Sequence, residues 1–414
     1  MMTTQTLDFP KQLSTLDKTS RSIAFSCLNK LSVGTLSIVE EFAMGDVVQR
    51  ERFGEPQSGQ PAAVIIVRNP AFYSRLLKGG SIAAAESYMD GWWETPDLTA
   101  LMELMALNMG ALDTIENRSS FLSTLLNKFN HWLNRNTVEN SEKNISAHYD
   151  LSNELYQTFL DENMLYSSAL FQSPSDSLAQ AQINKMERLC QQLQLKATDH
   201  VIEIGTGWGA MAIYMAQTYG CKVTTTTISD AQFDYAKDKI EQLGLSSQIT
   251  LLKQDYRLLT GEFDKLVSIE MIEAVGKAFL PSYIRQCQSL LKPQGLMAIQ
   301  AITIADQRYK SYSNSVDFIQ KYIFPGGFLP SITALTQAAT NNSDLVVRDL
   351  FDIGEDYGKT LHCWRQAFNQ HLDTVKTLGF DERFIRMWNY YFCYCEGGFR
   401  AKTISTVHMT FQRP

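Results

Sequence analysis

Three glycines alternate with other residues between an apolar segment and a helical one. The stretch reads Glu203-Ile-Gly205-Thr-Gly207-Trp-Gly209 and follows the apolar residues Val201 and Ile202. Glycines at such a turn let a ligand approach the backbone and leave the first amides of the next helix free to bind it. The spacing differs from the G-x-G-x-x-G of dinucleotide sites, and no Lys-Ser/Thr pair follows as in triphosphate sites. The motif predicts a ligand-binding loop, and the alternative is a tight turn without a ligand.

The next predicted strand is rich in threonine where dinucleotide folds carry an acidic residue for the ribose hydroxyls. Thr227 ends this run of threonines, and Gln232 follows five residues later. A hydroxyl and an amide can form the same hydrogen bonds to a ribose without a charge. A threonine-rich segment is also a good strand in its own right, so this pattern alone is weak evidence for a ribose site.

Strands and helices alternate around these residues. Strands are predicted at 200–205, 222–229, 248–255, 263–271 and 295–304, and helices at 210–220, 230–244 and 278–291. Such alternation predicts an α/β fold with a parallel, Rossmann-like sheet and right-handed crossovers. Residues 403–411 place Val407, Met409 and Phe411 on one face, which predicts a final strand added antiparallel.

The N-terminal part has a different pattern. Residues 35–68 predict short strands and turns, residues 70–108 predict helices, and an Asn/Ser/Glu-rich tail ends near residue 140. We therefore expect a smaller N-terminal α+β domain over 1–140, for lipid binding or dimerisation, and the main domain over 141–414.

Composition limits the partners and the compartment. The 414 residues carry a net charge of −7, so no nucleic-acid partner is expected, because phosphate binding needs a basic face. Seven cysteines without disulfide-scaffold spacing favour a reducing compartment, and the polar N-terminus is not a signal peptide. The histidines are not spaced like metal ligands, so no metal is expected. The longest uncharged stretch, 322–343, contains prolines and glycines that argue against a transmembrane helix.

Seven segments, in order, resemble the cyclopropane fatty acid synthase family of class I S-adenosylmethionine-dependent methyltransferases. They are SAHYDLSNELYQTFLDENMLYSSALF (146–171), EIGTGWGAMA (203–212), TTISDAQFDYA (226–236), QDYRLL (254–259), FDKLVSIEMIEAVG (263–276), FIQKYIFPGGFLPS (318–331) and YYFCYCEGGFRAK (390–402). The resemblance covers roughly residues 145–412 and implies a class I methyltransferase fold with helical insertions over an acyl-chain site. Segment 89–108 looks like the extra domain of longer bacterial members.

The resemblance implies a cofactor site for S-adenosylmethionine. In the family pattern Tyr166 and Ser167 close over the cofactor, Thr227 and Gln232 contact the ribose, and the remaining matched positions form the loop and the adenine site. These remaining positions are Glu203, Gly205, Gly207, Gly209, Asp255 and Tyr256. For Tyr166 and Tyr256 the alternative is packing in the core, as aromatic residues at strand ends often do.

The family transfers a methyl group to the cis double bond of a phospholipid acyl chain, which leaves a carbocation. A base then removes a proton. Loss from the new methyl group closes a cyclopropane ring, and loss from a neighbouring chain carbon leaves a methyl-branched alkene. In the family the base is a bound bicarbonate, held by a Cys, a Glu, a His, a backbone group of an Ile and a Tyr.

Two of these five positions depart from the family pattern. Glu273, Ile302 and Tyr357 match it, whereas Ser168 stands in place of the Cys and Gln300 in place of the His. Ser168, Gln300 and Tyr357 could still donate hydrogen bonds to an anion, but a neutral Gln cannot offer a bicarbonate the positive charge of a His. The departures predict weaker bicarbonate binding or a different base, and they bear on the product more than on methyl transfer.

The resemblance also places Cys395 near the acyl site, where the alternative is a thiol that packs like a small apolar residue. The leading hypothesis is a cytoplasmic enzyme, peripherally associated with the inner face of the membrane, that forms cyclopropane fatty acids on unsaturated phospholipids. By analogy with longer family members, a homodimer is a further expectation. The alternatives are a methyl-branching relative, as in methyl-branched or furan fatty acid pathways, a small-molecule N- or O-methyltransferase, and a degenerate lipid-binding protein.

Overall fold

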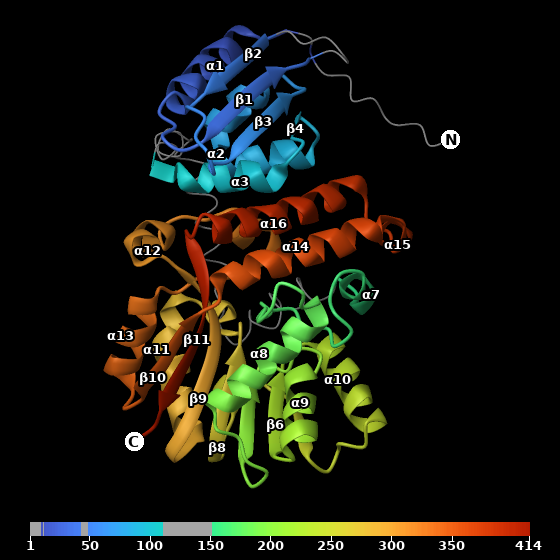
Figure 1. Ribbon diagram of the computed structural model, residues 1–414, viewed down its shortest axis with the longest axis vertical. Helices are drawn as coiled ribbons and strands as arrows, with labels where there is room; N and C mark the ends of the chain where they lie inside the picture. Colours follow the sequence, from blue (N-terminus) through green and yellow to red (C-terminus); the bar gives the residue numbers. More distant parts are fainter. Residues whose placement is uncertain (1–9, 11, 43–48, 111–150) are drawn as a thin grey trace. The chain divides into compact units, whose positions relative to one another are not determined.

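The computed structural model describes residues 10, 12–42, 49–110 and 151–414 (Figure 1). They form two compact units. Unit 1 contains the described residues up to 110 together with Val316–Phe318 and Phe380–Thr403. Unit 2 contains residues 151–315, Ile319–Gly379 and Ile404–Pro414.

Unit 1 is an α+β unit built on a four-stranded sheet in the order β2-β1-β3-β4. Strand β1 pairs antiparallel with β2 and parallel with β3, and β4 pairs antiparallel with β3. The strands are β1 (Thr35–Glu40), β2 (Gln49–Phe53), β3 (Ala62–Val67) and β4 (Trp93–Glu94). The helices are α1 (Thr15–Leu28), α2 (Phe72–Met89), α3 (Leu98–Leu107) and α16 (Glu382–Arg400). The strands predicted within 35–68 are thus present.

Helix α16 packs against α2 and α3 of unit 1, although it lies near the C-terminus of the chain. A Cβ atom at Gly397 would lie 2.6 Å from the backbone nitrogen of Glu103, so the two helices approach closely only because residue 397 is glycine. The buried Glu396 accepts a hydrogen bond from Thr99 and pairs with Arg400. Contacts therefore group 380–403 with the N-terminal residues, which differs from the predicted boundary at 140. The apolar pattern of a helix does not indicate which body will cover it.

Unit 2 is built on a seven-stranded sheet in the order β10-β11-β9-β8-β5-β6-β7. The strands are β5 (His200–Ile204), β6 (Lys222–Thr227), β7 (Ile249–Lys253), β8 (Phe263–Ile269), β9 (Leu291–Ile304), β10 (Val346–Asp352) and β11 (Ile404–Gln412). Strands β5 to β9 are parallel, and β11 is antiparallel to both β9 and β10. The five parallel strands and the antiparallel final strand confirm the prediction.

Strand β10 was not predicted, and it forms the edge of the sheet beside β11. Most of its residues are exposed, including Val346, Val347, Leu350 and Phe351. An exposed edge strand lacks the alternation of apolar and polar residues that marks a half-buried one, so periodicity could not reveal it.

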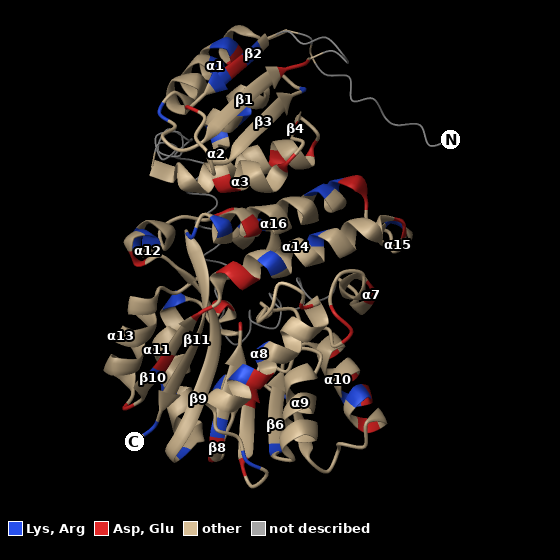
Figure 2. Ribbon diagram, viewed as in Figure 1, with Lys and Arg blue, Asp and Glu red and all other residues tan. Residues whose placement is uncertain are grey.

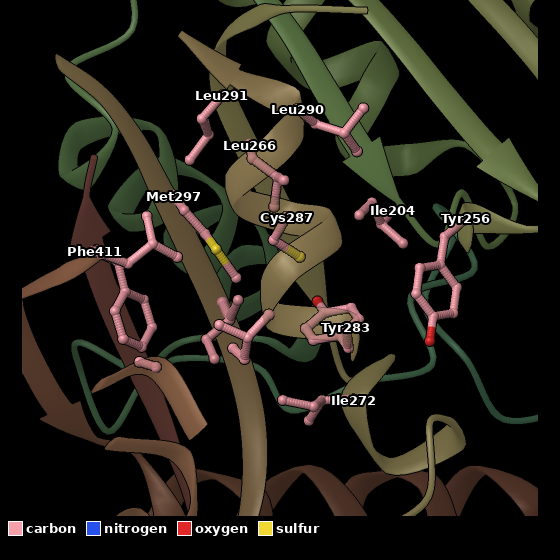
Figure 3. Packing of buried hydrophobic residues seen from close by; sticks show 14 of the residues in the cluster. Ile204, Tyr256, Leu266, Ile272, Tyr283, Cys287, Leu290, Leu291, Met297 and Phe411 are labelled. Carbon is pink, nitrogen blue, oxygen red and sulfur yellow. The ribbon is translucent and has the colours of Figure 1, made fainter. Parts of the chain in front are cut away.

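Residues of the sheet alternate between two hydrophobic cores, one on each face. Val201 packs with Met211 and Ile240, whereas its neighbours Ile202 and Ile204 pack with Tyr283 and other residues of the opposite core. Figure 3 shows the second core, in which Ile204 lies to one side of Tyr283 and Cys287 of helix α11, and Met297 and Phe411 lie to the other. Val407, Met409 and Phe411 are fully buried, as their shared face predicts.

Helices cover both faces of this sheet (Figure 1). Unit 2 contains the helical segments α7 (Asn153–Gln157), α8 (Leu178–Gln192), α9 (Ala210–Tyr219), α10 (Asp230–Gln242), η1 (Tyr256–Leu258), η2 (Ile272–Ala274), η3 (Lys277–Phe279), α11 (Leu280–Leu290), α12 (Asp306–Tyr312), η4 (Ile319–Ile323), α13 (Ile332–Asn342), α14 (Gly354–Gln370) and α15 (Leu372–Thr377). Charged residues lie mainly on these helices and at strand ends (Figure 2). Among the described residues, none of the helices combines the length and the apolar character that a membrane-crossing segment needs.

Candidate active site

The glycine loop lies between β5 and α9 and needs glycine for its backbone. Gly205, Gly207 and Gly209 have φ values of +100°, +53° and +93°, a region that favours glycine. A Cβ atom at Gly209 would lie 3.2 Å from Cβ of Ala236 in α10, whereas a Cβ atom at Gly207 would meet nothing within 4 Å. Gly209 therefore permits close packing against α10, and Gly207 borders open space in which a ligand can lie.

Glu203 is linked by hydrogen bonds to residues next to this loop. Its side chain is buried and accepts a 2.5 Å hydrogen bond from Thr225, whose hydroxyl also lies 2.7 Å from that of Thr206. Burial raises the pKa of Glu203 to about 8, so the carboxyl group is mostly protonated at neutral pH. The structure thus shows Glu203 hydrogen-bonded to the residues that shape the loop.

The predicted ribose residues lie together at the carboxyl end of β6. The hydroxyl of Thr227 donates to Oε1 of Gln232 at 2.9 Å and accepts from the amide of Ser229. The amide of Gln254 donates to the carbonyl of Thr227, which joins this end of β6 to the end of β7. Ligands of open α/β sheets bind at the carboxyl ends of the strands, where these residues lie.

Asp255 and Tyr256 follow β7. The carboxylate of Asp255 forms an ion pair with Arg257, and the ring of Tyr256 lies 5.5 Å from that of Tyr283. Tyr256 therefore packs on the core, as the alternative for this residue predicted, while Asp255 stays at the same end of the sheet as Thr227.

An aromatic cluster brings Tyr166 to the glycine loop. The ring of Tyr166 lies 5.2 Å from those of Tyr156 and Trp364, and Tyr156 lies 5.0 Å from Trp208 of the loop. Trp208 also donates to Oδ1 of Asn153 at 2.8 Å. The segment that carries Tyr166 is thus attached to the loop itself.

Ser167 is held by a buried lysine. Nζ of Lys185 donates to Oγ of Ser167 at 2.7 Å, and the side chain of Lys185 has no exposed surface. Burial lowers the pKa of Lys185 to about 8, against the charges of Glu270 and Asp161, which raise it. Sequence reasoning missed Lys185, because a lysine in an amphipathic helix is usually solvent-exposed.

The residues present fit S-adenosylmethionine. Open space borders Gly207, and the uncharged pair Thr227 and Gln232 offers a hydroxyl and an amide at the neighbouring strand end. Tyr166 and Ser167 lie in a segment joined to the loop through Trp208. These groups would hold the cofactor without an acidic ribose ligand.

A second site, next to Ser167, centres on the carboxylate of Glu270. Oε1 of Glu270 accepts from the amide of Ser168 and from Nε2 of Gln300, both at 2.8 Å, and Oε2 accepts from the hydroxyl of Tyr357 at 2.8 Å. Glu270 follows β8 directly and has a φ of +48°, which is uncommon outside glycine and typical of functional positions. Sequence reasoning missed Glu270, although it lies in the quoted segment 263–276.

Gln300 is oriented by a neighbour on the adjacent strand. Its Oε1 lies 2.8 Å from Nε2 of His408, which pairs with it in the β9–β11 ladder. Burial, together with the nearby charges of Arg188 and Lys185, lowers the pKa of His408 to about 3, so the ring is neutral and donates through Nε2. The amide nitrogen of Gln300 must then face Glu270 and the carbonyl of Ser168.

Glu273 is a second buried carboxyl group beside Glu270. Its Oε1 accepts from the amide of Ile302 at 2.5 Å, and its Oε2 is buried with no hydrogen-bond partner among the described residues. Burial, and then the charge of Glu270, raise the pKa of Glu273 to about 8. Burial also raises the pKa of Glu270, but the hydrogen bonds from Ser168, Gln300 and Tyr357 and the charge of Lys185 oppose this shift.

The five residues predicted to hold a bicarbonate lie close together in the structure. They do not line an empty anion pocket, because the carboxylate of Glu270 lies among them. Ser168 takes part through its amide, because its hydroxyl donates to the carbonyl of Ala169. Gln300 and Tyr357 also donate to the Glu270 carboxylate, and Ile302 donates to Glu273. A bicarbonate ion does not fit this arrangement, because its expected donors already bind a carboxylate of the chain.

Cys395 belongs to unit 1, on helix α16. The thiol is half-buried, and desolvation raises its pKa above the ordinary value. It is therefore a neutral thiol at physiological pH, which agrees with a packing role better than with nucleophilic chemistry.

Comparison with known proteins decides the family. Residues 136–409 match the family described as mycolic acid cyclopropane synthetase. The chain belongs to this family. It is an S-adenosylmethionine-dependent methyltransferase of the cyclopropane synthase type.

Similar members of the family are named for different lipid products. The chain is 36% identical to the tuberculostearic acid methyltransferase UfaA1 of Mycobacterium tuberculosis, over 85% of this chain and 83% of that protein. It is 35% identical to the cyclopropane-fatty-acyl-phospholipid synthase of Escherichia coli K12, over 87% of this chain and 91% of that protein. Among solved structures, the mycolic acid cyclopropane synthase CmaA1 complexed with SAH and CTAB aligns with a TM-score of 0.61 and 26% identity, covering 66% of this chain and 98% of that one.

Proposed function

We propose that this protein transfers a methyl group from S-adenosylmethionine to the double bond of an unsaturated acyl chain in a membrane phospholipid. The observation that carries the proposal is the pair of buried carboxyl groups, Glu270 and Glu273, next to the segment that holds Tyr166 and Ser167. Transfer to oxygen or nitrogen does not need such a pair, whereas transfer to an alkene must end with removal of a proton from carbon.

The reaction sets demands that these residues can meet. S-adenosylmethionine, when bound, supplies a methyl group on a positively charged sulfur. An alkene is a poor nucleophile, so the site must align it with that methyl group and exclude water from the resulting cation. Gly207, Thr227 and Gln232 would orient the cofactor, and the aromatic rings around Tyr166 would exclude water.

An apolar loop adjoins the carboxyl pair, with Phe328 buried and Phe324 and Leu329 half-buried. The amide of Phe328 donates to the carbonyl of Glu273 at 2.9 Å, and the amide of Leu329 donates to the hydroxyl of Tyr312 at 3.2 Å. Phe324, Phe328 and Leu329 therefore belong to a segment attached directly to Glu273. The loop supports a lipid substrate, as does the name of the synthase from Escherichia coli.

The product depends on which proton the base removes. A cyclopropane ring is the first candidate, because relatives named as cyclopropane synthases cover most of the chain. A methyl-branched acyl chain is the second, and it is favoured by the base site rebuilt around Glu270 and by the similarity to a tuberculostearic acid methyltransferase. Both products begin with the same methyl transfer.

Isotope labelling tests the proposal and separates the products. Cells that express the protein are fed methyl-deuterated methionine, and their phospholipid acyl chains are analysed by mass spectrometry. In a chain that has gained one carbon, two retained deuteriums together with a saturated ring indicate a cyclopropane, and three retained deuteriums indicate a methyl branch. Absence of labelled lipid, with a control synthase active in the same strain, would contradict the phospholipid substrate.

Two readings of other classes remain distinguishable by binding measurements. A degenerate lipid-binding protein need not bind S-adenosylhomocysteine, whereas an intact cofactor site should bind it in calorimetry. A small-molecule methyltransferase would bind it too, but would not require vesicles of unsaturated phospholipid for methyl transfer. We further infer that the enzyme is cytoplasmic, associates with the inner face of the membrane and forms a homodimer. Vesicle flotation tests the membrane association, and sedimentation tests the homodimer.

A further inference from the structure

We propose that the carboxylate of Glu270 is a built-in base that replaces bicarbonate and removes the proton from the methylated acyl chain. The inference rests on the proposed function, since it assigns the proton-removing step of that reaction. It concerns a residue that the family pattern did not mark, in the position where that pattern would place a separate ion.

The hydrogen-bond donors around Glu270 leave no role for a second anion. The amide of Ser168, Nε2 of Gln300 and the hydroxyl of Tyr357 each lie 2.8 Å from an oxygen of the Glu270 carboxylate. These groups belong to three of the five positions that the resemblance assigns to bicarbonate. An added bicarbonate would find its donors engaged and would also meet the negative charge of Glu270 at close range.

The two carboxyl groups of the site differ in what surrounds them. Glu270 accepts from donors at both oxygens, which stabilises a carboxylate. Glu273 accepts from the amide of Ile302 only, and its other oxygen is buried with no partner among the described residues. Two neighbouring buried carboxyl groups do not both ionise readily, so Glu270 carries the charge and Glu273 the proton.

The orientation of Gln300 supports the same assignment. A neutral His408 donates to Oε1 of Gln300 and turns the amide nitrogen towards Glu270. The amide thus serves as a donor to a fixed carboxylate, and it needs no positive charge, because the buried Lys185 already supplies one to the site. A neutral Gln300 in place of the family His therefore suits a site whose anion is the carboxylate of Glu270.

The π electrons of the alkene form the new carbon–carbon bond to the methyl carbon, and the carbon–sulfur bond breaks with its electron pair staying on sulfur. The cation that results loses a proton to an oxygen of Glu270. The electron pair of the broken carbon–hydrogen bond closes the ring or forms the new double bond, and Glu270 becomes a neutral acid that releases its proton before the next turnover.

Two substitutions of Glu270 test the inference on the full-length protein, with vesicles of unsaturated phospholipid as substrate. Glu270→Gln keeps the size of the side chain and removes the base, so methyl transfer should fall at least about 100-fold, with no rescue by added bicarbonate. Glu270→Gly suits the positive φ and empties the place of the carboxylate, so added bicarbonate should restore part of the activity. The matched control is Glu262→Gln, at an exposed position before β8.

Dependence on bicarbonate is then measured in buffers freed of carbon dioxide. The protein itself should work equally well with and without bicarbonate. Loss of its activity in the depleted buffer, or Glu270→Gln activity within about threefold of the parent, would overturn the inference. Binding of S-adenosylhomocysteine by each variant verifies that the cofactor site is folded.

A binding measurement separates failure of the inference from failure of the proposed function. Nuclear magnetic resonance of carbon-13 bicarbonate should show binding to Glu270→Gly and none to the parent protein. Binding to the parent would overturn the inference whatever the substrate is. If no methyl group reaches phospholipid but this binding difference is found, the substrate assignment has failed and Glu270 still occupies the anion position.

Discussion

Nε2 of His408 lies 2.8 Å from Oε1 of Gln300, and this contact determines which end of the Gln300 amide faces Glu270. The ring of His408 is neutral because burial, Arg188 and Lys185 lower its pKa to about 3. A neutral ring has one donor, and its Nδ1 has no hydrogen-bond partner among the described residues, so the proton resides on Nε2. His408 on β11 thus orients the side chain of Gln300 on β9, which in turn donates to the carboxylate of Glu270 after β8.

His408→Phe should therefore lower turnover about tenfold by releasing Gln300. The substitution removes the donor and leaves Oε1 of Gln300 buried without a partner, which costs about 1–3 kcal/mol. His408→Gln is the matched control, because its amide nitrogen can still donate to Gln300. Steady-state kinetics and thermal unfolding are measured on both variants. Equal turnover in the two variants at equal stability would contradict an orienting role for His408.

Alanine substitutions at Gly207 and Gly209 should have different effects. Gly207→Ala adds a methyl group to open space at a φ of +53°, so backbone strain should cost about 1–3 kcal/mol of stability, and binding of S-adenosylhomocysteine should weaken in addition. Gly209→Ala places a Cβ atom 3.2 Å from that of Ala236 at a φ of +93°, so it should cost about 1–3 kcal/mol of stability. Calorimetry and thermal unfolding check both. Similar losses of affinity in the two variants would show that Gly207 does not border the ligand.

Much of unit 2 could be predicted because its strands alternate with helices and its central strands, such as β5 and β9, are rich in buried apolar residues. The glycine loop was predictable for a different reason: Gly205, Gly207 and Gly209 are needed for the local backbone geometry, which leaves a mark in the sequence. Glu270 was not, because its role depends on a positive φ and on donors from residues 30 or more positions away. The contacts of helix α16 with α2 and α3 could not be predicted, because these partners are far from it along the chain.

The stability of the cofactor-free protein should fall as pH rises from about 6.5 to 8. Glu203 and Glu273 have folded-state pKa values raised to about 8, so in this range the folded state binds more protons than the unfolded state. Each group should contribute a loss of roughly 1–2 kcal/mol across this range. His408 opposes this loss only near pH 6.5, because its ring is neutral in the folded state while the unfolded ring is still partly protonated there.

Glutamine substitutions identify the groups responsible. Glu203→Gln and Glu273→Gln should each flatten the pH dependence of the unfolding free energy measured with urea, because glutamine resembles the protonated acid. Glu262→Gln, at an exposed position, should leave the dependence unchanged. An unchanged slope in both buried variants would mean that neither carboxyl group is protonated in the folded protein.

Lys185→Met should move the acidic limb of the pH–rate profile to higher pH. The rate requires an ionised Glu270, and the positive charge of Lys185 lowers the pKa of that carboxyl group, so removing the charge raises it. The lysine has its own pKa lowered to about 8 and is mostly charged below that pH, so the effect should be seen throughout the acidic limb.

Lys185 also donates to Ser167, and loss of that hydrogen bond alone could weaken cofactor binding. Ser167→Ala removes the same hydrogen bond while the charge stays, so it should lower cofactor affinity without moving the limb. An equal shift in both variants would assign the effect to the hydrogen bond and not to the charge.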